Sequence, residues 1–407
     1  MKRYVIVGAS FRCYTMFVEN LLEHFPTAGE ITGIYDLNKT RCQVFKKRIG
    51  EGLTIYDDFE KMLDSEKPDA VIVTTIDAYH HEYIIRALNK GYDVISEKPI
   101  TNTYEKCLAI REAEKKSGKK VTVTFNCRFM PCFVGLKKIV SSGKIGKVLS
   151  ISYEYFLNRW HGGDYFKRWH RRMENSGGML VHKSTHHFDA ISWILDDQPS
   201  KVSAIGNRVF YGDENRCFAE YCRACDKKDV CESYKSQTVE LDEELYFKAE
   251  KEDGYLRDKC CYKSDTNIYD NMSVSVLYNK GALLTYSLNL FSLRGEGQKI
   301  VITGEKGVAV YEGVSPSENP SVKPVIKVFT NEGKFETYDL PVLKGRHGGA
   351  DPLLVGMLMA GEKDEENLGQ LADSFAGISS ALIGISANES IATGKHIDIA
   401  SRLEQMK

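Results

Sequence analysis

The tripeptide Glu97-Lys98-Pro99 has the clearest chemical potential in this sequence. It follows the apolar run 92–96, which is typical of a buried parallel strand. In an open α/β sheet, ligands bind outside the carboxyl ends of the strands, so a lysine at this place borders the ligand crevice. Its ammonium can hold a hydroxyl and help to move a proton, while Pro99 fixes φ and stiffens the turn. Alone, the tripeptide is equally consistent with an ordinary surface turn.

Two further strands predict a cofactor site. Residues 2–7 form a nearly continuous apolar run that ends at Gly8, and a helical pattern follows. A second apolar run, 30–35, ends at Asp36. A carboxylate there can accept both hydroxyls of an adenosine ribose and repels a 2′-phosphate. This order of elements predicts a dinucleotide site that prefers NAD to NADP.

The phosphate-binding fingerprint of such sites is degraded here. The pattern G-x-G-x-x-G reads GASFRC from Gly8 to Cys13, so only the first glycine remains. Ser10 still lets the backbone approach a pyrophosphate, and Cys13 is small enough for a contact between helix and strand. Arg12 is expected either beside the phosphate or facing solvent.

Length and charge exclude several classes of protein. The chain has 407 residues and a formal net charge of −1. That length allows two domains, and a near-neutral chain lacks the electrostatic footprint of nucleic-acid binding. No apolar run approaches the roughly 20 residues that span a bilayer, and no signal-peptide pattern precedes the first strand. We therefore expect a cytoplasmic protein that binds neither nucleic acid nor membranes.

The rhythm of the elements predicts an α/β protein with two unlike domains. Residues 1–125 alternate short strands with helices, which predicts an NAD-binding Rossmann domain with a doubly wound parallel sheet. Residues 126–407 are expected to form an α+β domain for substrate binding, with a large, mostly antiparallel open sheet. One face of that sheet is available to a partner subunit, so we expect a dimer or tetramer. The expected strands are 4–7, 31–35, 70–74, 93–96, 121–125, 147–156, 272–278, 282–291, 299–303 and 308–311, and the expected helices are 79–90, 104–117, 131–142 and 181–195, with further helical segments between 353 and 393.

Several motifs together resemble the Gfo/Idh/MocA family of NAD(P)-dependent oxidoreductases. They are the Rossmann pattern, the segment 75–80 (TIDAYH), Glu97-Lys98-Pro99 and the segment 126–128 (NCR). The segment 176–178 (SGG) and the later 186–189 (HHFD) complete the set. The resemblance covers almost the whole chain.

The resemblance implies roles for individual residues. The family's catalytic set is the lysine at Lys98 and a histidine at His186, which takes the proton from the hydroxyl being oxidised. The family's aspartate four positions before that histidine is replaced here by His182. The residues implied at the cofactor are Gly8, Ser10, Phe11, Arg12 and Asp36 on the adenosine half, and Thr75, Asp77, His80, Glu97, Lys98 and Asn126 on the nicotinamide half.

The replacement of aspartate by His182 has three readings. On one helix, His182 and His186 would lie one turn apart on the same face. A second histidine cannot stabilise an imidazolium as a carboxylate does, so His186 would have a lower pKa than in other family members. The alternatives are a shared metal ion or simple packing.

An aromatic stretch, 158–172, is expected to be an irregular loop that selects the substrate. Aromatic rings stack on sugar faces, while basic and acidic side chains bind hydroxyls or a carboxylate. A satellite core under a long loop is the alternative. The candidate substrate contacts are Arg128, Trp160, His161, Tyr165, Trp169, Lys183 and His187.

A cysteine cluster lies in an insertion at about 211–270. In a cytoplasmic protein such thiols are reduced or bind metal. The pair Cys222 and Cys225 has metal-knuckle spacing, Cys231 follows, and Cys260 or Cys261 completes a set of four. A structural zinc is the leading expectation because this polar segment cannot pack a core of its own. An iron–sulfur cluster and free thiols stay open.

Three functions fit these residues. The first is NAD-dependent oxidation of a secondary hydroxyl on a sugar, sugar acid or cyclitol. The second is a redox-assisted glycosidase that oxidises C3 transiently, eliminates the aglycone and reduces the sugar again; His182 or His187 would supply its extra base. The third is a cofactor-binding regulatory protein without turnover.

Overall fold

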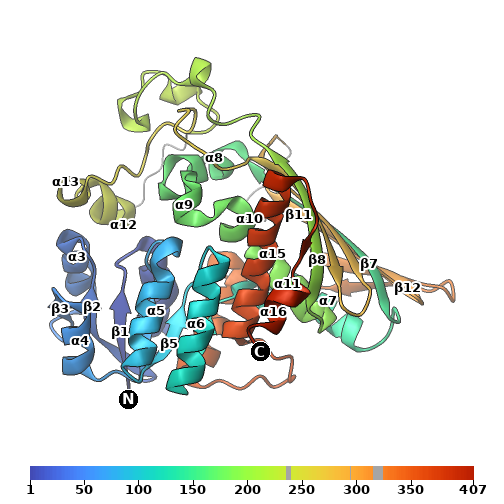
Figure 1. Ribbon diagram of the computed structural model, residues 1–407, viewed down its shortest axis with the longest axis horizontal. Coiled ribbons are helices and arrows are strands. Elements are labelled where there is room, and N and C mark those ends of the chain that lie inside the picture. The colour runs from blue at the N-terminus through green and yellow to red at the C-terminus, as the bar shows by residue number, and fades with distance from the viewer. Residues whose placement is uncertain (235–239, 294, 315–323) are drawn as a thin grey trace.

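The computed structural model of the chain describes residues 1–234, 240–293, 295–314 and 324–407, and consists of two sheets side by side (Figure 1). The first has seven strands in the order β15-β6-β5-β4-β1-β2-β3. All its pairings are parallel except the one between β15 and β6. Its strands are β1 (Lys2–Val7), β2 (Gly29–Tyr35), β3 (Thr54–Tyr56), β4 (Ala70–Val73), β5 (Asp93–Ser96), β6 (Val121–Val123) and β15 (Ala372–Asp373).

Helices cover both faces of this first sheet. Val5 and Val7 of β1 belong to one hydrophobic core, whereas Tyr4 and Ile6 of the same strand belong to another. Burial on both faces explains why the strand is apolar throughout. The helices of this half are α1 (Phe11–Cys13), α2 (Glu19–His24), α3 (Lys39–Ile49), α4 (Phe59–Glu66), α5 (His80–Asn89) and α6 (Tyr104–Ser117), and a π-helical turn, Tyr14–Val18, joins α1 to α2.

The second sheet has nine strands in the order β14-β13-β12-β11-β7-β10-β9-β8-β16. Only β7 and β10 pair in parallel. Along β9, exposed and buried residues alternate, which is the pattern of a sheet with one covered face. The strands are β7 (Val148–Asn158), β8 (Pro199–Asn207), β9 (Asn271–Tyr278), β10 (Leu283–Ser292), β11 (Gly297–Gly304), β12 (Gly307–Val314), β13 (Val325–Thr330), β14 (Phe335–Asp339) and β16 (Ile397–Asp398).

The long helix α15 (Ser374–Thr393) connects the two halves. It packs on β8 of the second sheet and on α6 and β6 of the first. In Figure 1 it stands between them. The remaining helices are α7 (Pro131–Ser141), α8 (Arg159–Lys167), α9 (Met173–Ser176), α10 (Gly178–His182), α11 (Thr185–Leu195), α12 (Glu240–Asp242), α13 (Glu250–Asp253), α14 (Ala350–Val355) and α16 (Ala400–Glu404).

The predicted fold class is confirmed, and two expected elements were wrong. The stretch 158–172 is no irregular loop: Asn158 accepts a hydrogen bond from the His161 amide at 2.9 Å and caps α8. The expected helix 181–195 is two helices, α10 and α11, which break at Lys183 and Ser184.

The domain boundary at residue 125 stays a prediction, and one strand beyond it, β15, belongs to the first sheet. In the described ranges, no helix is long and apolar enough to cross a membrane.

Candidate active site

The crevice for a dinucleotide opens where β1 and β4 end side by side. Strand order reverses there, which is the place where open α/β sheets bind ligands. Gly8 has φ +100°, and a Cβ on it would lie 2.7 Å from the Thr74 backbone. The Thr74 hydroxyl also donates to the Gly8 carbonyl at 2.6 Å. A larger residue therefore cannot replace Gly8 without moving β4.

Asp36 and Ser10 shape the adenosine side of this crevice. The Asp36 carboxylate accepts the Ala9 amide and the Asn38 amide, each at 2.7 Å. These bonds aim it at the turn after β1, where a ribose would lie. The Ser10 hydroxyl accepts the Cys13 amide at 3.1 Å and caps the first helix.

Arg12 is bound by carboxylates. Its guanidinium donates to Glu97 at 2.8 Å and to Asp351 at 2.8 Å. Asp351 also accepts the Asn126 amide group at 2.8 Å and contacts His347 at 2.9 Å. Arg12 thereby ties the first helix to the Glu97 turn and to α14. A role of Arg12 at the phosphate stays a prediction.

The cysteine-rich insertion reaches over the adenosine side. The Tyr246 hydroxyl accepts the Phe11 amide at 3.0 Å. Glu252 accepts the amides of Lys39 and Thr40 at 2.6 and 2.8 Å, at the N-terminus of α3. In Figure 1 the segment with α12 and α13 lies next to α3. The Glu252 carboxylate therefore already binds the free amides at the N-terminus of α3 and offsets the positive end of the helix dipole.

Lys98 lies at the carboxyl end of β5. Its Nζ donates to the His182 carbonyl at 2.9 Å, which joins the two halves of the protein. Burial lowers the pKa of Lys98 to about 8, although Asp77 and Glu97 oppose the shift. Behind it, His80 contacts the Pro99 carbonyl at 2.8 Å and the Thr75 carbonyl at 3.0 Å. His80 thus fixes the two turns that carry Thr75 and Lys98.

His182 is paired with Asp77. The distance from His182 Nδ1 to Asp77 Oδ2 is 2.6 Å, and Asp77 is buried. Burial raises the pKa of Asp77, and Lys98 opposes that shift. Burial, followed by Lys98 and His170, lowers the pKa of His182 well below its ordinary value. The His182 ring and the Asp77 carboxyl group thus share a hydrogen bond, and the carboxyl group missing at position 182 is supplied from the other half of the protein.

His186 is the second histidine of the site. It is buried against the Phe125 ring, and its Nδ1 lacks a hydrogen-bond partner among the described residues. Burial, then Lys98 and Lys183, lower the pKa of His186 well below its ordinary value. Because the causes are burial and these lysines, the expected contrast with family members that have aspartate at this position stays a prediction. The helix break after His182 removes the helical geometry from which a shared face was expected.

The predicted substrate residues divide into two groups. Arg128 is buried in an ion pair with Asp189 at 2.6 Å, and His187 bonds the Tyr286 hydroxyl at 2.8 Å. These two are committed to the protein interior. Around His182, by contrast, lie His170, with its ring 4.2 Å away, and the rings of Tyr165 and Trp169 at 5.7 and 5.6 Å. Trp160 stacks on His161 beside Tyr165, and Lys183 lies over Tyr155.

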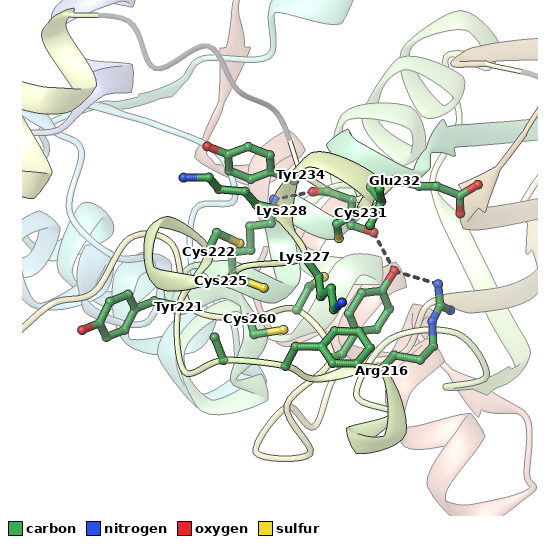
Figure 2. A pocket seen from close by; sticks show the side chains of 17 residues that line it. Arg216, Tyr221, Cys222, Cys225, Lys227, Lys228, Cys231, Glu232, Tyr234 and Cys260 are labelled. Atoms are coloured by element: carbon green, nitrogen blue, oxygen red, sulfur yellow. Dashed lines mark hydrogen bonds between the residues drawn. The ribbon is translucent and has the colours of Figure 1, made fainter.

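The predicted zinc site is not supported by the structure and stays a prediction. Figure 2 shows Cys222, Cys225, Cys231 and Cys260 around one pocket of about 260 Å³. In the ranges that the structure describes, no group of three or more His, Cys, Asp or Glu side chains is placed to hold a metal ion. The Cys217 thiol donates to the Ala219 carbonyl at 3.4 Å, and burial raises the pKa of Cys222 to about 12. The spacing brings these thiols to one pocket, and all eleven cysteines are free thiols. Among the described residues, no such group includes His182 and His186 either.

Sequence reasoning missed four residues of the site. Asp351, Glu252 and Tyr246 come from parts of the chain distant from the motifs, and no spacing rule connects them to the cofactor crevice. His170 lies inside the aromatic stretch 158–172, and its position next to Trp169 in the sequence could have identified it as a candidate site residue.

Comparisons with known proteins agree with this geometry. Residues 2–125 match the model described as "Oxidoreductase family, NAD-binding Rossmann fold", and residues 137–399 match "Oxidoreductase family, C-terminal alpha/beta domain". The fold and site thus define an NAD-binding oxidoreductase. The chain belongs to the Gfo/Idh/MocA family, as its motifs indicated.

Individual relatives agree with this assignment. A Bacillus subtilis (strain 168) protein named as an oxidoreductase, YteT, is 35% identical over 98% of this chain and 97% of its own. An inositol 2-dehydrogenase/D-chiro-inositol 3-dehydrogenase of Halalkalibacterium halodurans is 28% identical over 48% of this chain and 53% of its own. An Agrobacterium radiobacter oxidoreductase solved with NAD+, L-tartaric acid and magnesium has a TM-score of 0.68 at 15% identity, covering 98% of this chain and 99% of that one. This last likeness supports the fold.

Proposed function

We propose that this protein oxidises a secondary hydroxyl of a sugar, sugar acid or cyclitol with NAD. The observation that carries the proposal is the junction of Lys98 with the Asp77–His182 pair, where the Lys98 ammonium and the His182 carbonyl are 2.9 Å apart. It brings a cation of lowered pKa and a neutral, carboxylate-bound imidazole to the carboxyl ends of β4 and β5. These are the groups that alcohol oxidation requires.

Each residue has a part in the proposed reaction. Lys98 holds the hydroxyl oxygen of the substrate with its ammonium, and the neutral His186 takes the hydroxyl proton. Asp77 fixes the ring of His182 and offsets the charge of Lys98. Asp77 and His182 therefore act as positioning residues for Lys98. NAD, when bound, accepts the hydride from the same carbon. The alcohol becomes a ketone, and the proton leaves through the imidazole.

The adenosine side supports a preference for NAD over NADP. Asp36 is fixed by two backbone amides, and Glu252 occupies the N-terminus of α3. A helix N-terminus is the natural place for a phosphate group. Two carboxylates there repel the 2′-phosphate of NADP.

A redox-assisted glycosidase is the second candidate. His170 lies next to His182 and is a further base, and its Nδ1 has no partner among the described residues. The contacts of Tyr246 and Glu252 with the crevice favour retention of the cofactor between turnovers. Such retention is what a net redox-neutral reaction requires.

The substitution Lys98→Ala tests the proposal. The variant is expected to lose nearly all turnover while its affinity for NAD stays within a few-fold, because the lysine acts in the transition state and the cofactor is held elsewhere. The readouts are NADH absorbance with a panel of sugars, sugar acids and cyclitols, and a fluorescence titration with NADH. An unchanged kcat in the variant would remove the proposed role of Lys98.

A further inference from the structure

Lys183 is a cation without a matching anion. It lies in the break between α10 and α11, directly after His182. Its Nζ is 5.3 Å from the centre of the Tyr155 ring. Among the described residues, no carboxylate lies within 4.0 Å of this Nζ. Lys183 is half-buried, and an ammonium withdrawn from water is costly unless a negative group compensates it.

The neighbouring cations differ from Lys183 in this respect. Arg12 is paired with Glu97 and Asp351, Arg128 with Asp189, and Arg168 with Asp164. Each of these ion pairs has an N–O distance of 2.6 to 2.8 Å. In the described part of the site, two lysines therefore lack an ion pair: Lys98, whose ammonium binds the His182 carbonyl, and Lys183.

The nearest acid, Glu296, is already engaged. Its carboxylate contacts His161 Nδ1 at 2.9 Å and accepts the Tyr155 hydroxyl at 3.2 Å. The Tyr165 hydroxyl lies 3.4 Å from His161 Nε2 and extends this series of hydrogen bonds. Glu296 thus organises the polar wall beside Lys183 without forming an ion pair with it. Because both tyrosine hydroxyls are already bonded within this wall, the Lys183 ammonium is the donor left for a carboxylate.

Lys183 also lies close to the reacting groups. It follows His182, whose carbonyl binds Lys98, and it precedes His186 by less than one helical turn. The positive charges of Lys98 and Lys183 act together on the His186 imidazole. One small molecule can therefore contact Lys183 while its hydroxyl is held at Lys98.

We propose that Lys183 binds a carboxylate of the substrate, so the substrate is a sugar acid rather than a neutral sugar or cyclitol. This inference rests on the proposed oxidation. In it, the carboxylate stays unchanged while a carbon bearing a hydroxyl gives its hydride to NAD and the hydroxyl proton to His186. Ion pairing gives Lys183 the anion that it lacks and fixes which hydroxyl faces Lys98.

Matched pairs of sugars test the inference. D-glucuronate and D-glucose form one pair, and D-galacturonate and D-galactose another; each is measured by NADH formation and by binding to the NADH-loaded protein. The acid is expected to have the higher kcat/KM by about 10- to 150-fold, as for a hydrogen bond to a charged group. In Lys183→Met this preference should fall to near one, mainly through KM of the acid, while Lys183→Arg should keep most of it. Lys138→Met, which removes an exposed lysine paired with Glu366, is the control and should keep the preference.

The outcomes separate the inference from the proposed function. Oxidation of the neutral members with no preference for the acids would overturn the inference and leave the oxidation standing. A preference that survives in a folded Lys183→Met, as judged by circular dichroism and thermal melting, would also overturn it. If neither member of either pair binds or reacts, both the inference and the proposed function are contradicted.

Discussion

Asp77 and His182 form a hydrogen bond across the two halves of the protein, with 2.6 Å between Oδ2 and Nδ1. Asp77 follows β4 in the first sheet, whereas His182 ends α10 in the second half. The same histidine accepts the Lys98 ammonium through its carbonyl. His182 thus contacts Asp77 through its ring and Lys98 through its backbone carbonyl. The geometry of the active site therefore depends on how the two halves of the protein pack.

The substitution Asp77→Asn should lower kcat by about 100-fold, because general acid–base groups that are mispositioned lose contributions of this size. The amide keeps the shape but not the charge that offsets Lys98. Affinity for NAD should change little. Steady-state kinetics and an NADH titration measure both, and Asp64→Asn, which alters an exposed ion pair with Lys90, is the control. Equal losses in the two variants would show that Asp77 has no special role.

The pH profile should report on Lys98. Its pKa is lowered to about 8, and the reaction needs the charged ammonium, so kcat/KM is expected to fall as the pH rises through that value. The histidines, whose pKa values are lowered by burial, stay neutral and active at mildly acidic pH. Lys98→Arg should move the alkaline limb to higher pH, and Asp77→Asn should move it to lower pH. An activity that rises through the alkaline range in the wild type would mean that Lys98 works as a neutral base.

Coenzyme choice should depend on Glu252 as well as Asp36. The double change Asp36→Asn and Glu252→Gln removes two negative charges from the adenosine side, so affinity for NADP should rise at least about tenfold, since a like-charge contact costs several kcal/mol. Fluorescence titration with both reduced coenzymes gives the ratio. Glu250→Gln, which alters a nearby ion pair with Arg223, is the matched control. If the double variant discriminates as sharply as the wild type, the 2′-phosphate would have to be excluded by other groups.

The open face of the second sheet is the expected subunit contact. Leu277 and Leu283 lie opposite each other on β9 and β10, and both are exposed. An apolar patch on an open sheet is typical of an interface. Leu283→Glu should therefore convert the oligomer to a smaller species in light scattering, whereas Leu22→Glu on α2 should leave it intact. A wild type that is monomeric at micromolar concentration would contradict this expectation.

The first half of the fold could be predicted closely from sequence because its strands are apolar and buried on both faces. The short strands β3 and β15 were missed, since three and two residues give no period. The helix at 159–167 was read as a loop because its glycines and aromatic residues obscure the pattern. Capping by Asn158 was a local signal that could have corrected it.

The sequence predicted which residues form the site, but it did not predict their hydrogen-bond and ion-pair partners. The motifs indicated Lys98, His182 and His186, yet the bond of His182 to Asp77 links positions 105 residues apart in the sequence. Spacing could not show that Arg12 and Arg128 are held by Asp351 and Asp189. The cysteine spacing correctly brought Cys222, Cys225, Cys231 and Cys260 to one pocket, whereas the described residues show no group of three or more side chains placed to hold a metal ion, so the zinc stays a prediction.

The stoichiometry between free NAD+ and substrate tests the central claim most directly. The desalted protein is mixed with added NAD+ and with sugars, sugar acids and their aryl glycosides, and NADH, ketone and released aglycone are quantified together. We predict that NADH and ketone form in equal amounts, in proportion to the substrate consumed, and that no aglycone is released. Release of aglycone by a cofactor that stays bound, without net NADH, would contradict the proposed dehydrogenase and establish the glycosidase.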